Sequence, residues 1–170
     1  PVNSLDEWNK VSTDLEKLLS FLSGDKWEIK FREVKKEENV QRQLFNNPKG
    51  IEVVSLFSGG LDSFIGAIDL LEQKKKTIFV SHYKGGTPEK TAQDTLFRKL
   101  EETYKSYALN HYQFFVQPNQ KHKLATKESS SRCRSFIFIV LGITIANSLE
   151  NTIKLCVPEN GFISLNVPLT

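Results

Sequence analysis

The segment 51–73 constrains the fold more than any other part of the sequence. Residues 51–57 form a nearly continuous apolar run, which is typical of a strand buried on both faces of a sheet. A short loop with two consecutive glycines, 58–63, follows this run, and the spacing of apolar residues then predicts a helix over 63–73. A buried strand, a glycine loop and a helix in this order are the opening of a parallel α/β unit.

The same alternation continues along the rest of the chain. Apolar runs bounded by turn residues predict strands over 77–83, 112–116 and 152–157, and helical periodicity predicts helices over 87–107 and 132–149. We therefore expect an α/β fold of Rossmann-like type, with a parallel sheet, helices on both faces and right-handed crossovers. Because ligands bind such sheets at the carboxyl ends of the strands, the segments of interest are 58–63, 81–87, 117–134 and 158–164.

The first part of the chain follows a different pattern. Apolar residues at helical spacing predict a helix over 5–21 that ends at Gly24. Residues 27–32 alternate apolar and polar, which predicts a half-buried strand. A turn cluster at 46–50 places a boundary near Pro48.

Two domains follow from this boundary. We expect residues 1–47 to form an N-terminal accessory segment, a helix plus a strand, and residues 48–170 to form the α/β domain. The sequence starts at Pro1, contains no methionine and stops at Thr170, so we expect it to be a piece of a longer protein that continues at the C-terminus.

The overall composition excludes several classes of protein. Hydrophobic residues make up 39% and charged residues 25%, as in soluble globular proteins, and the longest apolar run, 136–146, is shorter than the roughly 20 residues of a membrane helix. A net charge of +3 gives little reason to expect direct nucleic-acid binding. Cys133 and Cys156 provide neither a disulfide framework nor a four-cysteine zinc site. With no signal peptide visible, we expect a reducing, cytoplasmic setting.

Each residue type in the loop 58–63 has a chemical use. Gly59 and Gly60 permit positive φ angles and let a phosphate approach the backbone, while the loop N–H groups and the helix start attract negative charge. The hydroxyls of Ser58 and Ser63 add donors, and the carboxylate of Asp62 suits the Mg²⁺ that accompanies ATP. The alternative is a tight turn in which Asp62 or Ser63 caps the helix. No Walker pattern occurs in the sequence, which makes γ-phosphate transfer the less favoured chemistry.

The loop sequence SGGLDS resembles the signature of the ATP pyrophosphatase (PP-loop) superfamily. The resemblance implies an adenine nucleotide alpha hydrolase-like fold of the HUP type, in which attack at the α-phosphate of ATP gives an adenylated substrate and pyrophosphate. It implies that pyrophosphate is bound by Ser58, Gly59, Gly60, Leu61, Asp62 and Ser63. It also implies adenine binding by backbone groups near Phe57, Val80 and Ser81.

Two further segments, 132–136 and 157–168, resemble the 7-cyano-7-deazaguanine synthase-like (QueC-like) component of Qat anti-phage systems. That resemblance implies ATP- and Mg²⁺-dependent adenylation of a carboxylate such as 7-carboxy-7-deazaguanine, followed by amidation with ammonia or an amine. It also implies other proteins of a defence complex as partners. The chain departs from the housekeeping synthases because it lacks the CxxC pattern of their structural zinc site.

The candidate residues in two segments outside the loop each allow a functional and a purely structural interpretation. Arg132 and Arg134 begin an apolar helix, where they could neutralise the α-phosphate or bind the substrate carboxylate; the alternative is a solvated helix start. The segment Glu159, Asn160, Gly161 and Phe162 could recognise a purine-like base, or it could be a turn with a packed aromatic. We expect His82 near the adenine and ribose, and His111 on the surface. Asp62, Ser63 and Arg134 are the predicted catalytic residues.

Two other functions fit the same loop. One is a nucleotide-binding subunit that senses ATP in a defence complex without turning it over. The other is tRNA thiolation, which would require a basic RNA-binding face and a functional Cys133.

Overall fold

The computed structural model describes residues 2, 4–33, 48–84, 88–116, 132–149 and 153–159. The chain divides into two compact units. The smaller unit comprises Pro1–Asn46 and Lys127–Phe136, and the larger comprises Asn47–Thr126 and Ile137–Thr170.

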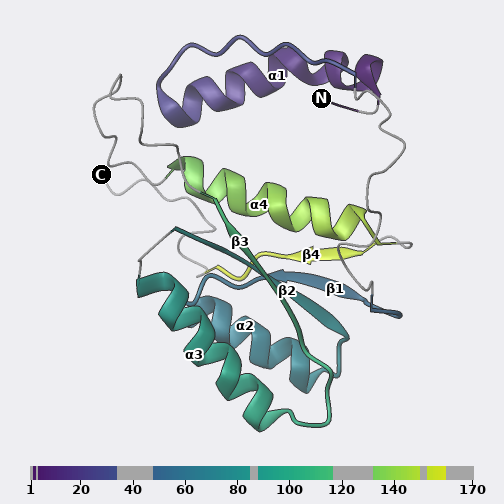
Figure 1. Ribbon diagram of the computed structural model, residues 1–170, viewed down its shortest axis with the longest axis vertical. Coiled ribbons are helices and arrows are strands. Elements are labelled where there is room, and N and C mark those ends of the chain that lie inside the picture. Colours follow the sequence, from purple (N-terminus) through teal and green to yellow (C-terminus); the bar gives the residue numbers. More distant parts are fainter. Residues whose placement is uncertain are drawn as a thin grey trace. The chain divides into compact units, whose positions relative to one another are not determined.

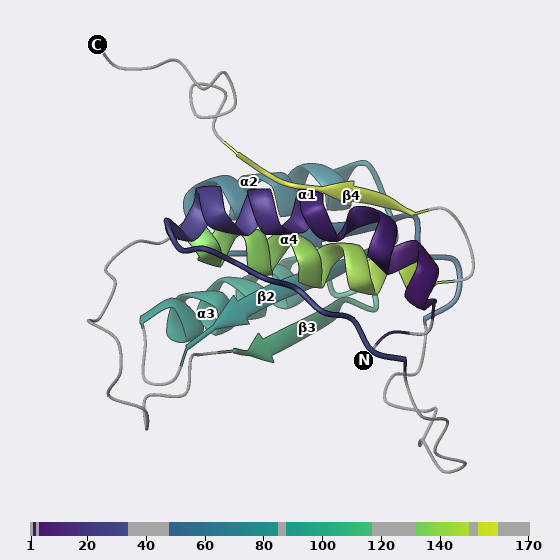
Figure 2. The same cartoon turned by 90° about the horizontal axis from the view of Figure 1, so that it is seen from above.

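The larger unit is built on a four-stranded parallel sheet (Figure 1). The strands are β1 (Val53–Leu56), β2 (Thr77–Tyr83), β3 (Asn110–Phe115) and β4 (Lys154–Cys156), in the order β3-β2-β1-β4. Figure 2 shows β3 and β4 at opposite edges. The predicted α/β fold with a parallel, Rossmann-like sheet is confirmed.

The order of the strands places β1 where the chain changes direction. The chain adds β2 and then β3 on one side of β1, and it adds β4 on the other side. Val53 accordingly pairs with Thr77 of β2 and with Lys154 of β4. In open parallel sheets, the carboxyl end of the strand at such a reversal is where ligands bind.

Helices cover both faces of this sheet (Figure 1). Helices α2 (Leu61–Glu72) and α3 (Pro88–Thr103) cover one face, and α4 (Arg132–Asn147), from residue 137 onward, covers the other. Gly142 lets α4 approach closely, because a Cβ there would lie 2.7 Å from Leu56 Cδ2 and 2.8 Å from Leu155 Cδ1.

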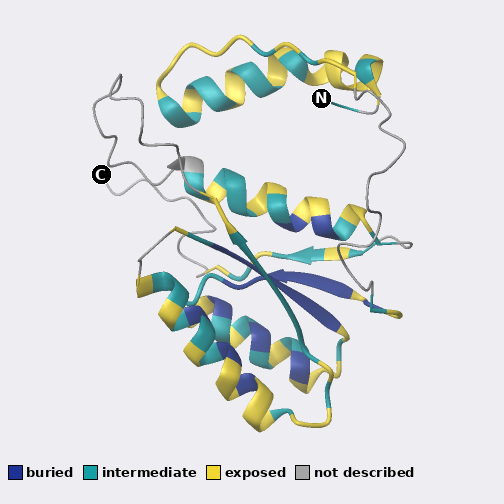
Figure 3. Cartoon of the chain, viewed as in Figure 1, coloured by how far each residue is buried: buried dark blue, intermediate teal, exposed yellow. Residues whose placement is uncertain are grey.

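Each face has its own core, because side chains alternate along a strand. On one side, which we call the α4-face core, the buried residues are Ile51, Val54, Leu56, Ile78, Val80 and Ile145. On the other, the α2/α3-face core, they are Phe57, Ala67, Leu71, Phe79, Phe97 and Leu100. Figure 3 shows β1 and β2 buried, with β3 less so.

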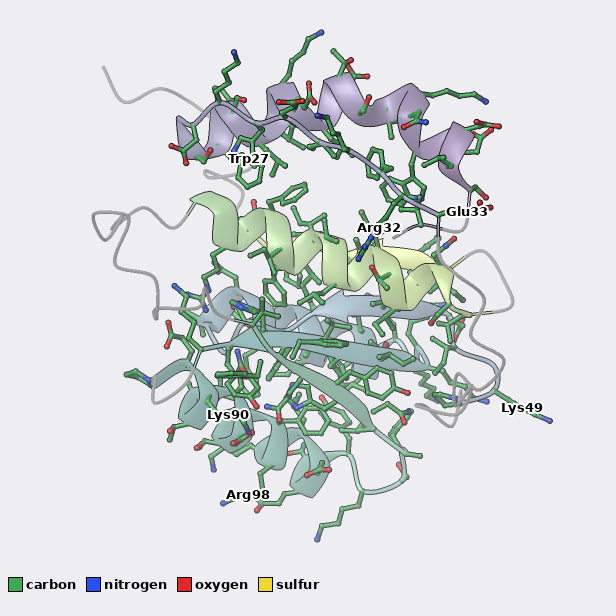
Figure 4. The ribbon with its side chains drawn as sticks, turned by 45° about the horizontal axis from the view of Figure 1, so that its top comes forward. Trp27, Arg32, Glu33, Lys49, Lys90 and Arg98 are labelled. Carbon is green, nitrogen blue, oxygen red and sulfur yellow. The ribbon has the colours of Figure 1, made fainter. Side chains whose placement is uncertain are left out.

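In the smaller unit, α1 (Leu5–Ser23) ends as predicted at Gly24, which has φ +78° and whose N–H bonds to Ser20 O at 2.8 Å. Trp27 folds back on the helix end through an Nε1–H bond of 2.8 Å to Ser23 Oγ, and Figure 4 labels this side chain.

The strand predicted over 27–32 is wrong for the described residues. The backbone there is extended, but the structure assigns it no ladder, only an isolated bridge between Val2 and Glu33. The amide of Ile29 donates to Glu16 Oε1 at 2.8 Å rather than to a neighbouring strand. An alternating pattern shows that one side of a segment is buried, and it does not supply the second strand that a ladder requires.

Among the helices in the described ranges, none is both long enough and apolar enough to cross a membrane.

Candidate functional site

The loop 58–60 joins the carboxyl end of β1 to the start of α2, as predicted. Phe57, the last residue before the loop, donates its N–H to Val80 O at 2.7 Å, which extends the pairing with β2 to the loop itself. The loop then turns to the surface: Gly60 and Asp62 are exposed, and Leu61 is 71% exposed. The strand, loop and helix predicted from the sequence are therefore all present.

A closed ring of three hydrogen bonds holds the loop. Ser58 Oγ donates to Ser63 Oγ at 3.1 Å, Ser63 Oγ donates to Gly60 O at 2.9 Å, and Gly60 N–H donates to Ser58 Oγ at 3.3 Å. Each hydroxyl donates once and accepts once, so both serines are engaged in shaping the loop. Ser63 is 3% exposed, consistent with this internal role.

The interpretation of the loop as a capped turn finds no support in this geometry. The N-cap residue of α2 is Gly60, and no side chain makes a capping hydrogen bond there. Ser63 donates to a carbonyl instead of accepting from a first-turn amide. Phe64 N–H makes the first intrahelical hydrogen bond, to Gly60 O at 3.1 Å. The N–H groups of 61–63 come before it in the chain and therefore have no acceptor within the helix.

Gly59 meets two separate requirements. Its φ of +85° lies in the left-handed region that side chains disfavour. In addition, a Cβ at this position would lie 3.0 Å from Gln93 Cγ and 3.1 Å from Gln93 N, both on α3. The glycine thus allows the loop to lie directly against the first turns of α3.

Asp62 stands exposed in the first turn of α2. No group of three or more His, Cys, Asp or Glu side chains that could hold a metal ion occurs among the residues described. Mg²⁺, however, is commonly held by one or two carboxylates together with substrate phosphates and waters. A single exposed carboxylate such as that of Asp62 is compatible with this mode of binding.

The residues expected near adenine lie inside the sheet. Phe57, Val80 and Ser81 are fully buried, so only their backbone groups could take part in binding a nucleotide. Ser81 Oγ donates to Phe57 O and lies 2.7 Å from His111 Nε2. Because the one hydroxyl proton of Ser81 goes to Phe57 O, the N–H of His111 donates to Ser81.

His111 is partly buried with its ring packed against the α2/α3-face core, so the prediction of a surface residue is wrong. Its ring lies 4.3 Å from the ring of Phe97 and 5.5 Å from that of Phe57, centroid to centroid. Burial among these rings lowers the pKa of His111 from 6.5 to about 4; Asp94 opposes this lowering and Lys90 adds to it. His111 is therefore neutral at physiological pH and acts as a hydrogen-bond donor within the core.

Sequence reasoning also missed Gln93 on α3, which has 0% exposure. Its Nε2 donates to Ser58 O at 3.2 Å and to His82 O at 3.0 Å, so one amide joins the ends of β1 and β2. The spacing of Gln93, Phe97 and Leu100 was the available signal, because it places a polar residue on the apolar stripe of the helix.

His82 is buried, with 2% exposure, rather than open to a ligand. Its Nε2 lies 2.9 Å from Val116 O, and its Nδ1 has no hydrogen-bond partner within the described structure.

A polar cluster lies at the start of α3, where Figure 4 labels Lys90. Lys90 pairs with Asp94, its Nζ lies 5.5 Å from the ring centroid of Tyr83, and Gln113 Nε2 donates to Asp94 at 2.9 Å. Burial acts to raise the pKa of Asp94, but hydrogen bonds from Lys90 and Gln113 outweigh it and the pKa is lowered. These polar groups are therefore hydrogen-bond and charge partners of one another.

The remaining predicted residues are placed only in part. Arg132 and Arg134 lie in the first turn of α4, and only Arg134 has a described side chain, which is partly buried. Glu159 is exposed after β4. The residues Asn160, Gly161 and Phe162 lie outside the described residues, as do the loop 117–131 and most of 158–164.

The segment after β4 lies against α2. A Cβ on Gly66 would come within 2.8 Å of Pro158 Cβ, so the residue preceding Glu159 contacts the second turn of α2. The loop 58–60 and Glu159 thus belong to segments that meet on the same helix. Arg134 belongs to the smaller of the two units.

Neither a scan against protein-family models nor searches of curated proteins and of solved structures finds a match to this chain.

Proposed function

We propose that the loop 58–63 binds the β- and γ-phosphates of ATP and that the chain catalyses adenylation of a carboxylate. The observation that carries this proposal is the uncapped start of α2 beside Gly59 and Gly60. The hydroxyls of Ser58 and Ser63 are engaged in hydrogen bonds within the loop. The amides of the first turn of α2 have no acceptor within the helix and lie next to exposed residues. Backbone amides at a helix start are suited to an anion such as a polyphosphate.

Asp62 is the residue that would hold Mg²⁺, in company with the phosphates. When bound, the ion would neutralise charge on the departing pyrophosphate. The amides of 61–63 would face the same charge, and the buried hydroxyl of Ser63 would keep the loop in shape. Most of the catalysis would come from positioning and from charge stabilisation.

The proposed reaction has two steps. A carboxylate oxygen of the substrate attacks the α-phosphorus, and the bond to the bridging oxygen of pyrophosphate breaks, giving an acyl adenylate. The nitrogen of ammonia or of an amine then attacks the acyl carbon, AMP leaves with the electron pair of the C–O bond, and the nitrogen loses a proton. Arg132, Arg134 and the segment 159–162 are the proposed contacts to the α-phosphate and to a substrate such as 7-carboxy-7-deazaguanine.

The finer assignments follow from the same proposal. The sheet would be of the HUP type, residues 1–47 would be an accessory segment, and the protein would act in the cytoplasm with other proteins of an anti-phage defence complex. The order β3-β2-β1-β4 and the loop at the end of β1 support the HUP assignment.

The substitution Asp62→Ala tests the proposal in full-length protein. The measurement is the release of AMP and pyrophosphate from ATP with a panel of carboxylates that includes 7-carboxy-7-deazaguanine, with ammonia as the acceptor. Loss of the only exposed carboxylate in the loop should reduce AMP release at least about 100-fold, since a group that stabilises developing charge contributes on that scale.

Asp69→Ala is the matched control, because Asp69 is an exposed aspartate on the same helix, seven residues further along. It should leave both the rate and the thermal midpoint unchanged. Full activity in Asp62→Ala would rule out the proposed mechanism. If the protein binds ATP but releases no AMP with any of the carboxylates, it is an ATP-sensing subunit instead. Activity that depends on tRNA and on Cys133 would identify a thiolating enzyme.

A further inference from the structure

Gln93 is a fully buried polar side chain whose amide contacts the phosphate loop. Its two amide hydrogens account for its two bonds, one to Ser58 O and one to His82 O. The orientation of the amide is fixed by its partners, because the reverse orientation would place Oε1 against two carbonyl oxygens. Gln93 therefore acts on the loop as a donor.

The bond to Ser58 O determines the direction of the next amide. In a trans peptide the C=O and N–H point in opposite directions. With Ser58 O directed at Gln93, the N–H of Gly59 points away from α3. Gly59 itself lies against α3, since a Cβ there would meet Gln93 Cγ at 3.0 Å. The Ser58–Gly59 peptide is thus held with its donor on the side remote from the helix.

This arrangement leaves Oε1 of Gln93 buried without a hydrogen-bond partner in the described part of the chain. A buried, unsatisfied acceptor is destabilising by roughly 1–3 kcal/mol. Methionine has the same length and would fill the same place on the apolar stripe with Phe97 and Leu100 without that cost. The packing of this position therefore does not require an amide, and the function of the amide lies in its hydrogen bonds to Ser58 O and His82 O.

We propose that Gln93 is a positioning residue, which holds the Ser58–Gly59 peptide so that the Gly59 N–H faces the bound pyrophosphate. This inference rests on the proposed function of the loop. Without the donor, the peptide can rotate and turn a carbonyl oxygen toward the phosphates, where it would repel them. Gln93 touches neither the substrate nor the reacting atoms, and it acts through the loop.

The test uses Gln93→Met in the full chain, with Gln113→Met as the matched control. Gln113 also donates through its amide, but its partner is the side chain of Asp94. We expect Gln93→Met to weaken the binding of inorganic pyrophosphate at least about 10-fold, measured by calorimetry with Mg²⁺ present at a temperature where the variant is folded. Gln113→Met should bind pyrophosphate as the wild type does. A merely structural role for Gln93 would lower the thermal midpoint and leave the pyrophosphate affinity of the folded variant unchanged.

A second measurement needs no variant. A scalar coupling across the hydrogen bond between the Gln93 side-chain nitrogen and the Ser58 carbonyl carbon should be detectable by NMR in the wild-type chain. Its absence would overturn the proposal, even if Gln93→Met failed to fold. Unchanged pyrophosphate affinity in a folded Gln93→Met would overturn the positioning role alone, whereas a wild-type chain that binds neither pyrophosphate nor ATP would overturn the function of the loop as well.

Discussion

The two faces of the sheet are packed by different chemistry. Buried residues of the α4-face core are isoleucine, valine and leucine throughout. On the opposite face, the rings of Phe57 and Phe97 contact both His111 and Phe79, and Ser81 and Gln93 make directional hydrogen bonds.

The difference teaches where stability and loop geometry are determined. Apolar packing is non-directional, whereas a hydrogen bond fixes the distance and angle between its two groups. On the α2/α3 face these bonds end at Phe57 O and Ser58 O, the carbonyls that lead into the loop. Changes on the α4 face should therefore alter stability alone, and changes on the other face should also alter the loop.

The largest expected effect comes from truncating one large core side chain on each face of the sheet. Phe97→Ala should reduce the free energy of unfolding by about 3–5 kcal/mol, and Ile145→Ala by about 2–5 kcal/mol, measured by urea denaturation. Only Phe97→Ala should raise the pKa of His111 toward 6.5, because water then reaches its ring. NMR titration of His111 measures this pKa, and an equal value in both variants would contradict the comparison. Phe97→Leu serves if the alanine variant does not fold.

A smaller effect is expected from the titration of His111. Since burial lowers the pKa of His111 to about 4, the folded protein keeps it neutral while the unfolded chain binds a proton below about pH 6.5. Its contribution to stability is thus complete above pH 6.5, and it decreases as the pH falls from 6.5 to 4. The slope is up to about 1.4 kcal/mol per pH unit, with a total on the order of 3 kcal/mol.

The variant His111→Phe isolates this contribution, because the other acidic groups titrate in both proteins. We expect the stability difference between wild type and variant, from urea denaturation at several pH values, to change between pH 6.5 and 4 and to be constant above pH 7. A difference that does not vary with pH would show that His111 is accessible to protons in the folded chain.

The smallest expected effect distinguishes two glycines at opposite ends of β1. Gly59 and Gly50 have φ angles of +85° and +75°, so alanine at either should cost about 1–2 kcal/mol from the backbone alone. At Gly50 the new Cβ would meet only the flexible end of Lys76, but at Gly59 it would meet the backbone of Gln93 at 3.1 Å. We expect Gly59→Ala to be the more destabilising by about 1 kcal/mol in urea denaturation and to weaken ATP binding. Equal losses of stability would contradict the close approach of α3.

Much of the fold was accessible from the sequence, because local signals were strong. The strand predicted over 77–83 is found at Thr77–Tyr83, and the loop 58–63 has the predicted strand before it and helix after it. The helix predicted over 87–107 ends earlier, at Thr103. Tyr104 and Tyr107 continue the helical spacing, but Tyr107 N–H closes a turn on Tyr104 O instead. A side-chain pattern does not distinguish these two backbone geometries.

The sequence predicted the candidate site only where its residues are close together in the chain. The glycine pair and Asp62 lie within four residues of one another in sequence, so the loop could be proposed as a site without a structure. His111 was misjudged because its direction depends on which residue of β2 it pairs with, and it pairs with Phe79. Gln93 lies 35 residues from Ser58, and no local pattern indicates that the two are bonded.

The edge position of β4 has a consequence for biosynthesis. Strands β1, β2 and β3 are complete once the ribosome has released residue 115, but the second edge of β1 remains unpaired until residues 154–156 emerge. In that interval the nascent chain presents the apolar sequence Val-Val-Ser-Leu along an open edge, which is a template for pairing with other chains. We therefore expect the three residues of β4 to reduce pairing of β1 with other chains as well as to complete the sheet.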